Sequence, residues 1–500
     1  MYYITYAVLL FRKCTLVVYQ AMNNKVSLFN WFRIVVGVLL VHTSVLGGGS
    51  IGLHPENPHY LVFRDKPTVL ITSAEHYGAV LNLDFNHTKY LDSLQKDGLN
   101  LTKIFTGTYV EYSGAFYIAS NTLAPATGRF ICPWSRSITP GCADGGTKFD
   151  LSQFDKNYFV RLKSFVSEAS QRGIVVEVCL FCSFFSDREW ALSPLNPANN
   201  INSLGRVWRD KVYTMDKHGG LLQFQEAMVR AIVTELKEFD NVFYEVCNEP
   251  YFGGATKEWQ DHMTDVILKS EGDLPAKHLI AHNIANGTAA IKDPHPGVSI
   301  FNFHYAAPPD AVPLNYHLNK VIGDDETGFN GTQDWAYRNE GWNFIFAGGS
   351  LFNSLDFSFA VGFEDGTFVY RPGQPGGGSP TLRKQLGILK RFVDSLDFVH
   401  MKPDNSVIVG GVPAGFSARA LVEDKKTYAV YIGRLPKTAI EGSCAANLQI
   451  MLPAGRYDVE WLNPTTGEIT KGDQLQHEGG KATLSTPAFS DDTALRISRK

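Results

Sequence analysis

The sequence predicts a (β/α)8 TIM barrel followed by a small all-β sandwich. The first observation is that short, continuous apolar runs alternate with amphipathic helical segments, as expected of parallel strands buried on both faces. The second is that eight such runs occur between residues 60 and 397, the number that closes a barrel. The third is that after residue 399 short strands alternate with turns and no amphipathic segment is left.

The predicted barrel strands lie near residues 70, 103, 177, 244, 281, 301, 321 and 355. Helical spacing follows most of them, at Thr88–Asp97, Lys156–Arg172, Leu221–Phe239, Lys257–Ser270, Asp334–Ala347 and Thr381–Leu396. Gly98 and Gly173 stand where the first two helices should end, because glycine readily adopts the left-handed cap conformation. No helix is apparent after the fifth and sixth strands. The glycine-rich stretch Pro372–Pro380 is expected to be a long loop before the last helix.

The predicted domain boundaries follow from these patterns. Residues 51–398 should form the barrel and residues 399–500 the sandwich. The predicted strands of the sandwich are Val407–Val409, Tyr428–Ile432, Leu448–Met451, Tyr457–Trp461 and Ala482–Leu484. No glycine-rich phosphate-binding motif follows the first strand, so a nucleotide-binding fold has no support.

Residues 1–50 have a different character. Their two apolar runs, Tyr2–Phe11 and Ile34–Leu46, are shorter than the roughly 20 apolar residues of a typical membrane span. The second run follows Arg33 and precedes small residues, which is the pattern of a secretory signal. We expect Met22 to be the true start, and a secreted protein with no stable membrane insertion after cleavage. The alternative is an uncleaved N-terminal anchor.

The overall composition excludes some partners. Forty-six Lys and Arg against 50 Asp and Glu leave a net charge of −4, so nucleic acid is not an expected partner. Cys132 and Cys142 lie in a Pro/Gly-rich loop and could pair, whereas Cys179-x-x-Cys182 lies in an apolar strand and is expected to hold buried thiols. No metal-ligand spacing accompanies these cysteines. We predict no metal and no cofactor, and the sequence leaves the oligomeric state open.

The chemistry of a barrel enzyme lies at the carboxyl ends of its strands. Candidate side chains there are His76 after the first strand, Lys103 on the second, Asn248 and Glu249 at the fourth, His304 and Tyr305 at the sixth, Glu326 at the seventh and Asp356 at the eighth, with Trp190 in the loop after the third. Strands four and seven of a closed barrel face each other across its mouth. Two facing carboxylates, Glu249 and Glu326, suit glycosidic cleavage, in which one protonates the leaving oxygen and the other attacks or activates water.

Several motifs resemble clan A of the retaining glycoside hydrolases, the superfamily of the cellulase-like enzymes. They are Asn248-Glu249-Pro250 at strand four, His304-Tyr305 at strand six and Glu326-Thr-Gly328 at strand seven. The segment Gly98–Ile104 (GLNLTKI) is similar to the second-strand motif of that clan, with Lys103 where an Arg is usual. In the tail, Trp461–Glu468 (WLNPTTGE) resembles a turn in the sandwich of the apiosidase-like enzymes.

This resemblance implies a retaining β-glycoside hydrolase that acts on a poly- or oligosaccharide. Glu249 would be the general acid/base and Glu326 the nucleophile. Asn248 would bond the sugar 2-hydroxyl, and His304 or Tyr305 would hold one of the two carboxylates. Lys103 would lie under the nucleophile and keep it ionised, although a Lys lacks the bidentate fork of an Arg.

Other interpretations of the same residues remain open. Asp324-Asp325-Glu326 could be a solvated acidic run or a cation site, and on a regular strand Asp324 and Glu326 would share a face while Asp325 points away. His76 could be a structural residue rather than a sugar ligand. The barrel could be a non-catalytic carbohydrate-binding protein, and the sandwich could anchor the protein to a polysaccharide or a partner.

Overall fold

The computed structural model describes residues 49–216, 220–272, 274, 277–371, 373–436, 438 and 442–500. The expected signal or anchor, with Met22 and both apolar runs, lies outside these residues. Within them, no helix is long and apolar enough to cross a bilayer. Residues 49–500 cluster as one compact unit.

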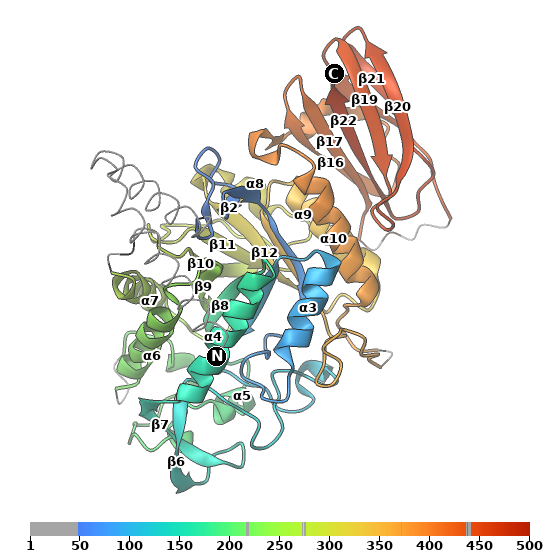
Figure 1. Ribbon diagram of the computed structural model, residues 1–500. Coiled ribbons are helices and arrows are strands. Elements are labelled where there is room, and N and C mark those ends of the chain that lie inside the picture. Colours follow the sequence, from blue (N-terminus) through green and yellow to red (C-terminus); the bar gives the residue numbers. More distant parts are fainter. Residues whose placement is uncertain are drawn as a thin grey trace, which may run out of the picture. The chain divides into compact units, whose positions relative to one another are not determined.

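Eight parallel strands form the barrel and confirm the predicted fold class (Figure 1). They are β4 (Leu70–Ala74), β5 (Leu101–Phe105), β8 (Val175–Cys182), β9 (Val242–Asn248), β10 (Ile280–Asn286), β11 (Ile300–His304), β12 (Val321–Thr327) and β13 (Leu351–Leu355). Their hydrogen-bonded order is β4-β13-β12-β11-β10-β9-β8-β5, and the two end strands, β4 and β5, pack against each other. Each predicted strand position falls within one of these strands.

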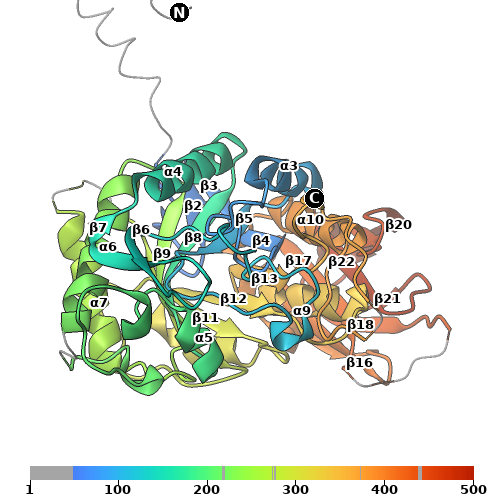
Figure 2. The same ribbon diagram turned by 90° about the horizontal axis from the view of Figure 1, so that it is seen from below.

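Helices lie outside the ring of strands, as Figure 2 shows. They are α3 (His87–Asp97), α4 (Lys156–Gln171), α6 (Leu221–Leu236), α7 (Lys257–Ser270), α9 (Asp334–Phe346) and α10 (Pro380–Asp394). Asn86 caps the start of α3 through Lys89 N, and Gly98, at φ 78°, ends it in the predicted left-handed conformation. As expected, the described residues hold no α-helix between β10 and β11, and only the five-residue α8 (Ala311–Asn315) between β11 and β12.

A small antiparallel sheet, which was not predicted, closes the amino end of the barrel. Its strands are β1 (Gly52–Leu53), β2 (Leu61–Phe63) and β3 (Lys66–Thr68). Ile51 and Leu61 pack on the first apolar side chains of the barrel strands, a layer that comprises Leu70, Leu101, Val175, Phe243, Leu279, Ala281, Ile300, Val321 and Leu351. Because this layer is apolar and buried, the polar interior above it is open only toward the carboxyl ends of the strands.

The long loops after β5 and β8 contain more regular structure than their sequences suggest. The first holds an antiparallel hairpin, β6 (Trp134–Pro140) and β7 (Thr147–Phe154). The second holds the short helix α5 (Asp187–Leu192), which begins with a capping box between Ser186 and Glu189. Cys132 and Cys142 are free thiols here.

The C-terminal region is a two-sheet antiparallel sandwich. One sheet has the order β14-β16-β17-β22-β19-β20 and the other β15-β18-β21, and both contribute to one apolar core. The strands are β14 (Lys402–Pro403), β15 (Ile408–Gly410), β16 (Phe416–Glu423), β17 (Thr427–Arg434), β18 (Asn447–Leu452), β19 (Gly455–Leu462), β20 (Ile469–His477), β21 (Gly480–Ser485) and β22 (Asp492–Arg499). Strands β14, β16, β20 and β22 were not predicted.

Helix α9 joins the two cores. Its Trp342 ring stacks on Tyr431 of β17 with ring centroids 5.1 Å apart. Its Arg338 pairs with Asp492 of β22, with Nε 2.7 Å from Oδ2. Both partners are buried, so the sandwich covers the side of α9 that the barrel leaves uncovered.

Candidate active site

Four strands end in sharp turns at the carboxyl mouth of the barrel. Tyr77 after β4, Glu249 after β9, Tyr305 after β11 and Phe329 after β12 all have positive φ, between 46° and 59°. This conformation is unfavourable for side chains other than glycine and costs about 1–3 kcal/mol per residue. Such strain is concentrated at functional sites, and these four side chains line the same pocket.

That pocket is small, with a cavity volume of about 60 Å³. Its lining includes five residues predicted from the sequence, namely His76, Asn248, Glu249, Tyr305 and Glu326. The rest of the lining is Tyr77, Phe105, Tyr109, Glu111, Phe116, Leu123, Cys182, Phe185 and Phe329. A small polar floor beneath aromatic walls suits a ligand that has both hydroxyls and apolar faces.

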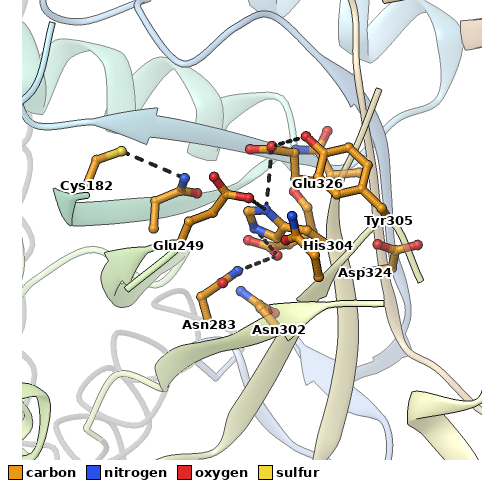
Figure 3. Close-up of polar contacts among 12 residues, drawn as sticks. Cys182, Glu249, Asn283, Asn302, His304, Tyr305, Asp324 and Glu326 are labelled. Carbon is orange, nitrogen blue, oxygen red and sulfur yellow. Dashed lines mark hydrogen bonds and ion pairs between the residues drawn. The ribbon is translucent and has the colours of Figure 1, made fainter. Parts of the chain in front are cut away.

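The two predicted catalytic carboxylates converge on His304, as Figure 3 shows. His304 Nδ1 lies 3.1 Å from Glu249 Oε1 and 3.5 Å from Glu326 Oε1. The ligand atoms of the three side chains all lie within 4.8 Å of one another. At least one oxygen of Glu249 therefore lies within 4.8 Å of an oxygen of Glu326.

Glu326 is held as an ionised, oriented carboxylate. Tyr305 donates its hydroxyl to Oε1 (2.7 Å), and Tyr77 donates to Oε2 (3.1 Å). Burial by itself would raise the pKa of Glu326, but the positive charge and hydrogen bond of His304, the charge of Lys103 and the Tyr305 hydroxyl together lower it to about 2. Glu326 is thus ready to act as a nucleophile at neutral pH.

His304 is fully buried and bridges the two carboxylates to Asp325. Its Nε2 lies 3.2 Å from Asp325 Oδ1. Burial lowers the pKa of a histidine, but here the charges of Glu326, Tyr251 and Asp325 raise the pKa of His304 well above its usual value. A charged imidazolium at this position donates from Nδ1 to Glu249 and pairs by charge with Glu326 and Asp325, which fixes the two glutamates relative to each other.

Lys103 lies deeper in the barrel than the pocket floor. Its Nζ is 2.6 Å from Asp325 Oδ2, 2.9 Å from Glu245 Oε1 and 2.9 Å from Asn248 Oδ1. Lys103 lowers the pKa of Glu326 through its positive charge and not through a hydrogen bond. The action of Lys103 on Glu326 is therefore less direct than predicted. By accepting from Lys103, the amide oxygen of Asn248 turns its NH₂ group toward the pocket side, where Cys182 Sγ lies 3.8 Å away.

The expected alternation of Asp324, Asp325 and Glu326 is wrong. A bulge in β12 places both Asp325 and Glu326 opposite His304 of β11, because His304 pairs with Glu326 directly after Phe303 pairs with Asp324. Asp325 consequently faces the barrel interior beside Glu326. Asp324 lies instead next to Glu340 of α9, and burial and that second carboxyl raise the pKa of Asp324 well above its usual range.

Two candidates from the sequence belong neither to the pocket lining nor to the polar network of Lys103 and His304 beneath it. Trp190 packs on Phe184 and donates its indole N–H to Val207 O, so it is a packing residue. Asp356 forms a buried ion pair with Arg383, 2.6 Å from Nη1, and also accepts from Ser73. Sequence position alone cannot distinguish such a buried structural polar residue from one that faces a ligand.

The sequence reasoning missed one charged residue of the pocket, Glu111. It lies in the loop after β5 and accepts from His76 Nε2 (3.2 Å) and Tyr109 OH (3.0 Å). His76 therefore lines the pocket and at the same time holds a structural partner. The four phenylalanines of the lining were also missed, because only the fold brings them together.

Solved glycoside hydrolases share this fold. A family 5 glycoside hydrolase from Bacteroides vulgatus has a TM-score of 0.61 over 90% of this chain and 94% of its own, at 14% identity. A protein from the same organism, solved as a proposed glycoside hydrolase, has a TM-score of 0.63 over 91% of this chain and 83% of its own, at 13% identity. A third structure, named simply as a glycoside hydrolase, has a TM-score of 0.60 over 91% and 97%, at 13% identity.

These similarities confirm at the level of the fold the resemblance expected from the motifs. No protein-family model and no curated protein matches the sequence. At such low identity a shared fold supports many activities, so the function has to be argued from the residues of the site.

Proposed function

We propose that this protein is a retaining β-glycoside hydrolase that cleaves a poly- or oligosaccharide by double displacement. The observation that supports it most is the close pair of Glu249 and Glu326, tied together by His304. A non-catalytic sugar-binding barrel would have no use for a buried, ionised carboxylate aimed at the same point as a second one.

In the first step Glu326 attacks the anomeric carbon of the sugar. The glycosidic C–O bond breaks as Glu249 donates its proton to the leaving oxygen, and an ester forms between Glu326 and the sugar. Because Tyr305 and Tyr77 orient the two oxygens of Glu326, the carboxylate reaches the carbon with little loss of freedom.

In the second step Glu249, now a carboxylate, takes a proton from water. The water oxygen attacks the same carbon, the ester bond breaks and Glu326 leaves as a carboxylate. Two inversions give net retention. The Asn248 amide would bond the 2-hydroxyl, a contact that strengthens in the transition state.

The test is a panel of aryl β-glycosides and polysaccharides with wild type, Glu249→Ala and Glu326→Ala. We expect each variant to lose at least about 10²-fold in kcat on the best substrate. Azide should partly rescue both, giving a glycosyl azide of retained configuration with Glu249→Ala and of inverted configuration with Glu326→Ala. The matched control is Glu258→Ala at the exposed start of α7, which should keep full activity.

Full activity of Glu326→Ala would overturn the mechanism, and hydrolysis of no glycoside by wild type would overturn the proposed function. Secretion also remains a proposal. N-terminal sequencing of the mature protein should find a start beyond residue 44, whereas a start at Met1 would contradict it.

A further inference from the structure

We propose that this hydrolase acts on chain ends. The pocket holds a single sugar at the non-reducing end, because a wall of His76 and Glu111 closes the pocket beyond that sugar. This inference rests on the proposed function and adds the class of substrate to it.

His76 joins the wall to the nucleophile's side of the pocket. His76 precedes Tyr77, whose hydroxyl bonds Glu326, and the His76 ring is 3.2 Å from Glu111. On the other side, Glu249 is followed by Phe252, whose ring contacts Phe185 of the pocket lining. Since the general acid protonates the leaving oxygen, the leaving group extends toward Phe252 and the far end of the sugar faces the wall.

Glu111 is fixed within this wall. Its backbone N–H donates to Leu123 O (2.8 Å), and Asn121 Nδ2 donates to Glu111 Oε2 (2.5 Å). Asn121 Oδ1 in turn accepts from Leu123 N (2.9 Å). The carboxylate is therefore clamped between two arms of its own loop and cannot swing aside without breaking several hydrogen bonds.

A second set of contacts fastens this loop to the end of β4. Thr122 Oγ1 donates to Glu75 Oε2 (2.5 Å) and lies 3.0 Å from His76 O. Gly78 packs so closely on the loop that a Cβ there would lie 2.3 Å from Thr122 O. The two loops that carry His76 and Glu111 thus form one rigid piece.

Glu111 is also the partition between two hollows. It lines the catalytic pocket on one side, and on the other side an outer hollow that is also lined by Tyr112 and Phe130. A sugar chain that continued past the pocket would need the space that Glu111 fills. Phe116 narrows the opening of the pocket further. The centroid of its ring lies 5.5 Å from that of Phe185 and 6.3 Å from that of Phe329.

The hydrogen-bonding capacity of Glu111 gives the wall a second role. An ionised carboxylate accepts about four hydrogen bonds, and its donors in the structure are one N–H of His76, shared by both oxygens, the Tyr109 hydroxyl and the Asn121 amide. These donors make two contacts to each oxygen, so a substrate hydroxyl bonds Glu111 by taking over one of the two contacts of the shared His76 N–H. A terminal sugar offers a free hydroxyl there, whereas a sugar within a chain would present a glycosidic oxygen, which cannot donate.

The experiment uses the nitrophenyl β-glycoside of the sugar that wild type hydrolyses best, and the nitrophenyl glycoside of the matching β-linked disaccharide. We expect immediate release of nitrophenol from the first. From the second, free monosaccharide should appear before nitrophenol, which should show a lag. Immediate nitrophenol together with intact disaccharide would overturn the proposal.

Two variants of Glu111 test whether this residue blocks the sugar chain or only supports the loop. Glu111→Ala should connect the two hollows and raise the rate on the disaccharide glycoside relative to the monosaccharide glycoside by about tenfold. Glu111→Gln keeps the volume but weakens one acceptor, so it should cost roughly 10- to 100-fold on the monosaccharide glycoside. In a series of glycosides that each lack one hydroxyl, Glu111→Gln should cause no loss of rate on the member that lacks the hydroxyl bound by Glu111.

Glu258→Gln is the control for both variants, and thermal melting verifies that each is folded. The proposal is wrong if substitution of Glu111 changes neither the ratio of the rates on the two glycosides nor the pattern of rates on the monodeoxy glycosides. If wild type hydrolyses none of these glycosides, the proposed function itself fails, which is a distinct result.

Discussion

Lys103 Nζ lies 2.6 Å from Asp325 Oδ2 in the centre of the barrel, and neither side chain is exposed to solvent. Glu245 approaches the same ammonium to 2.9 Å. A buried ion pair of this kind contributes little net stability, but removing one partner leaves an uncompensated charge at a large cost. Because Asp325 also pairs with His304, this ion pair lies beneath Glu249 and Glu326, the two proposed catalytic carboxylates.

Lys103→Met should therefore destabilise the fold by about 3–5 kcal/mol. The cause is the loss of the cation between Asp325 and Glu245. Unfolding by denaturant at pH 7 measures the change in the free energy of unfolding. Lys163→Met is the control, because its pair with Glu235 is exposed and should be worth less than about 1 kcal/mol. Equal effects of the two substitutions would contradict the role assigned to Lys103.

Tyr305→Phe tests how the ionisation of Glu326 is maintained. The substitution removes the 2.7 Å donor to Oε1, so the pKa of Glu326 should rise from about 2 toward its ordinary value. Only the ionised form attacks, so activity at low pH should fall, and the acid limb of kcat/KM should move up by on the order of one pH unit. Tyr428→Phe in the sandwich should leave the limb in place, and an unmoved limb in Tyr305→Phe would refute the prediction.

Glu340 should make the fold less stable at alkaline pH. Burial raises its pKa to about 7, although Thr327 and Asp324 bond its side chain. Since the folded pKa lies above the unfolded one, the stabilisation is present below about pH 4.5 and is lost as the pH rises through 7. The side chain introduced by Glu340→Gln stays neutral at every pH. Between pH 5 and pH 8 the free energy of unfolding of this variant, measured in urea, should therefore rise relative to wild type by on the order of 1–3 kcal/mol. Glu258→Gln at the exposed start of α7 is the control, and a pH-independent difference in stability between Glu340→Gln and wild type would exclude the effect.

Arg338→Met should uncouple the sandwich from the barrel. It leaves Asp492 buried without its cation, and we expect a loss of about 3–5 kcal/mol by thermal or chemical unfolding. Arg230→Met, which removes an exposed pair with Glu226 within one helix, should cost less than about 1 kcal/mol.

Removal of residues 400–500 should be more severe, because it uncovers Trp342, the aromatic residue of α9 that stacks on Tyr431. We expect residues 49–399 to aggregate or to melt at a much lower temperature than the whole chain. A soluble barrel of unchanged stability would show instead that the sandwich is an independent appendage.

Most of the barrel was predictable because each strand can be recognised from its own local sequence. A run such as Val175–Cys182 is apolar except for Glu177 and buried on both faces, and Gly98 marks a helix end by its backbone freedom alone. The small sheet beneath the barrel escaped prediction because β1 and β2 are very short and their apolar residues acquire meaning only against the strand ends. Strand β20 was missed for a related reason: most of its residues are exposed, and it has little apolar pattern.

The site was predictable where a residue type and a strand end coincide, as at Glu249 and Glu326. It was not predictable where geometry decides. The bulge that turns Asp325 inward is invisible in an Asp-Asp-Glu run. Glu111 lies far from any motif, in a loop whose course is set by Thr122 and Gly78.

Helix α9 has a consequence for how such proteins can be recombined. Its residues must satisfy two neighbours at once, since Trp342 and Arg338 face the sandwich while the same helix follows the strand that bears Glu326. A chimera that joined this barrel to a foreign sandwich would have to match both an aromatic stack and a buried ion pair. The two parts are therefore not interchangeable modules, and sequence changes on either side of α9 are expected to be correlated.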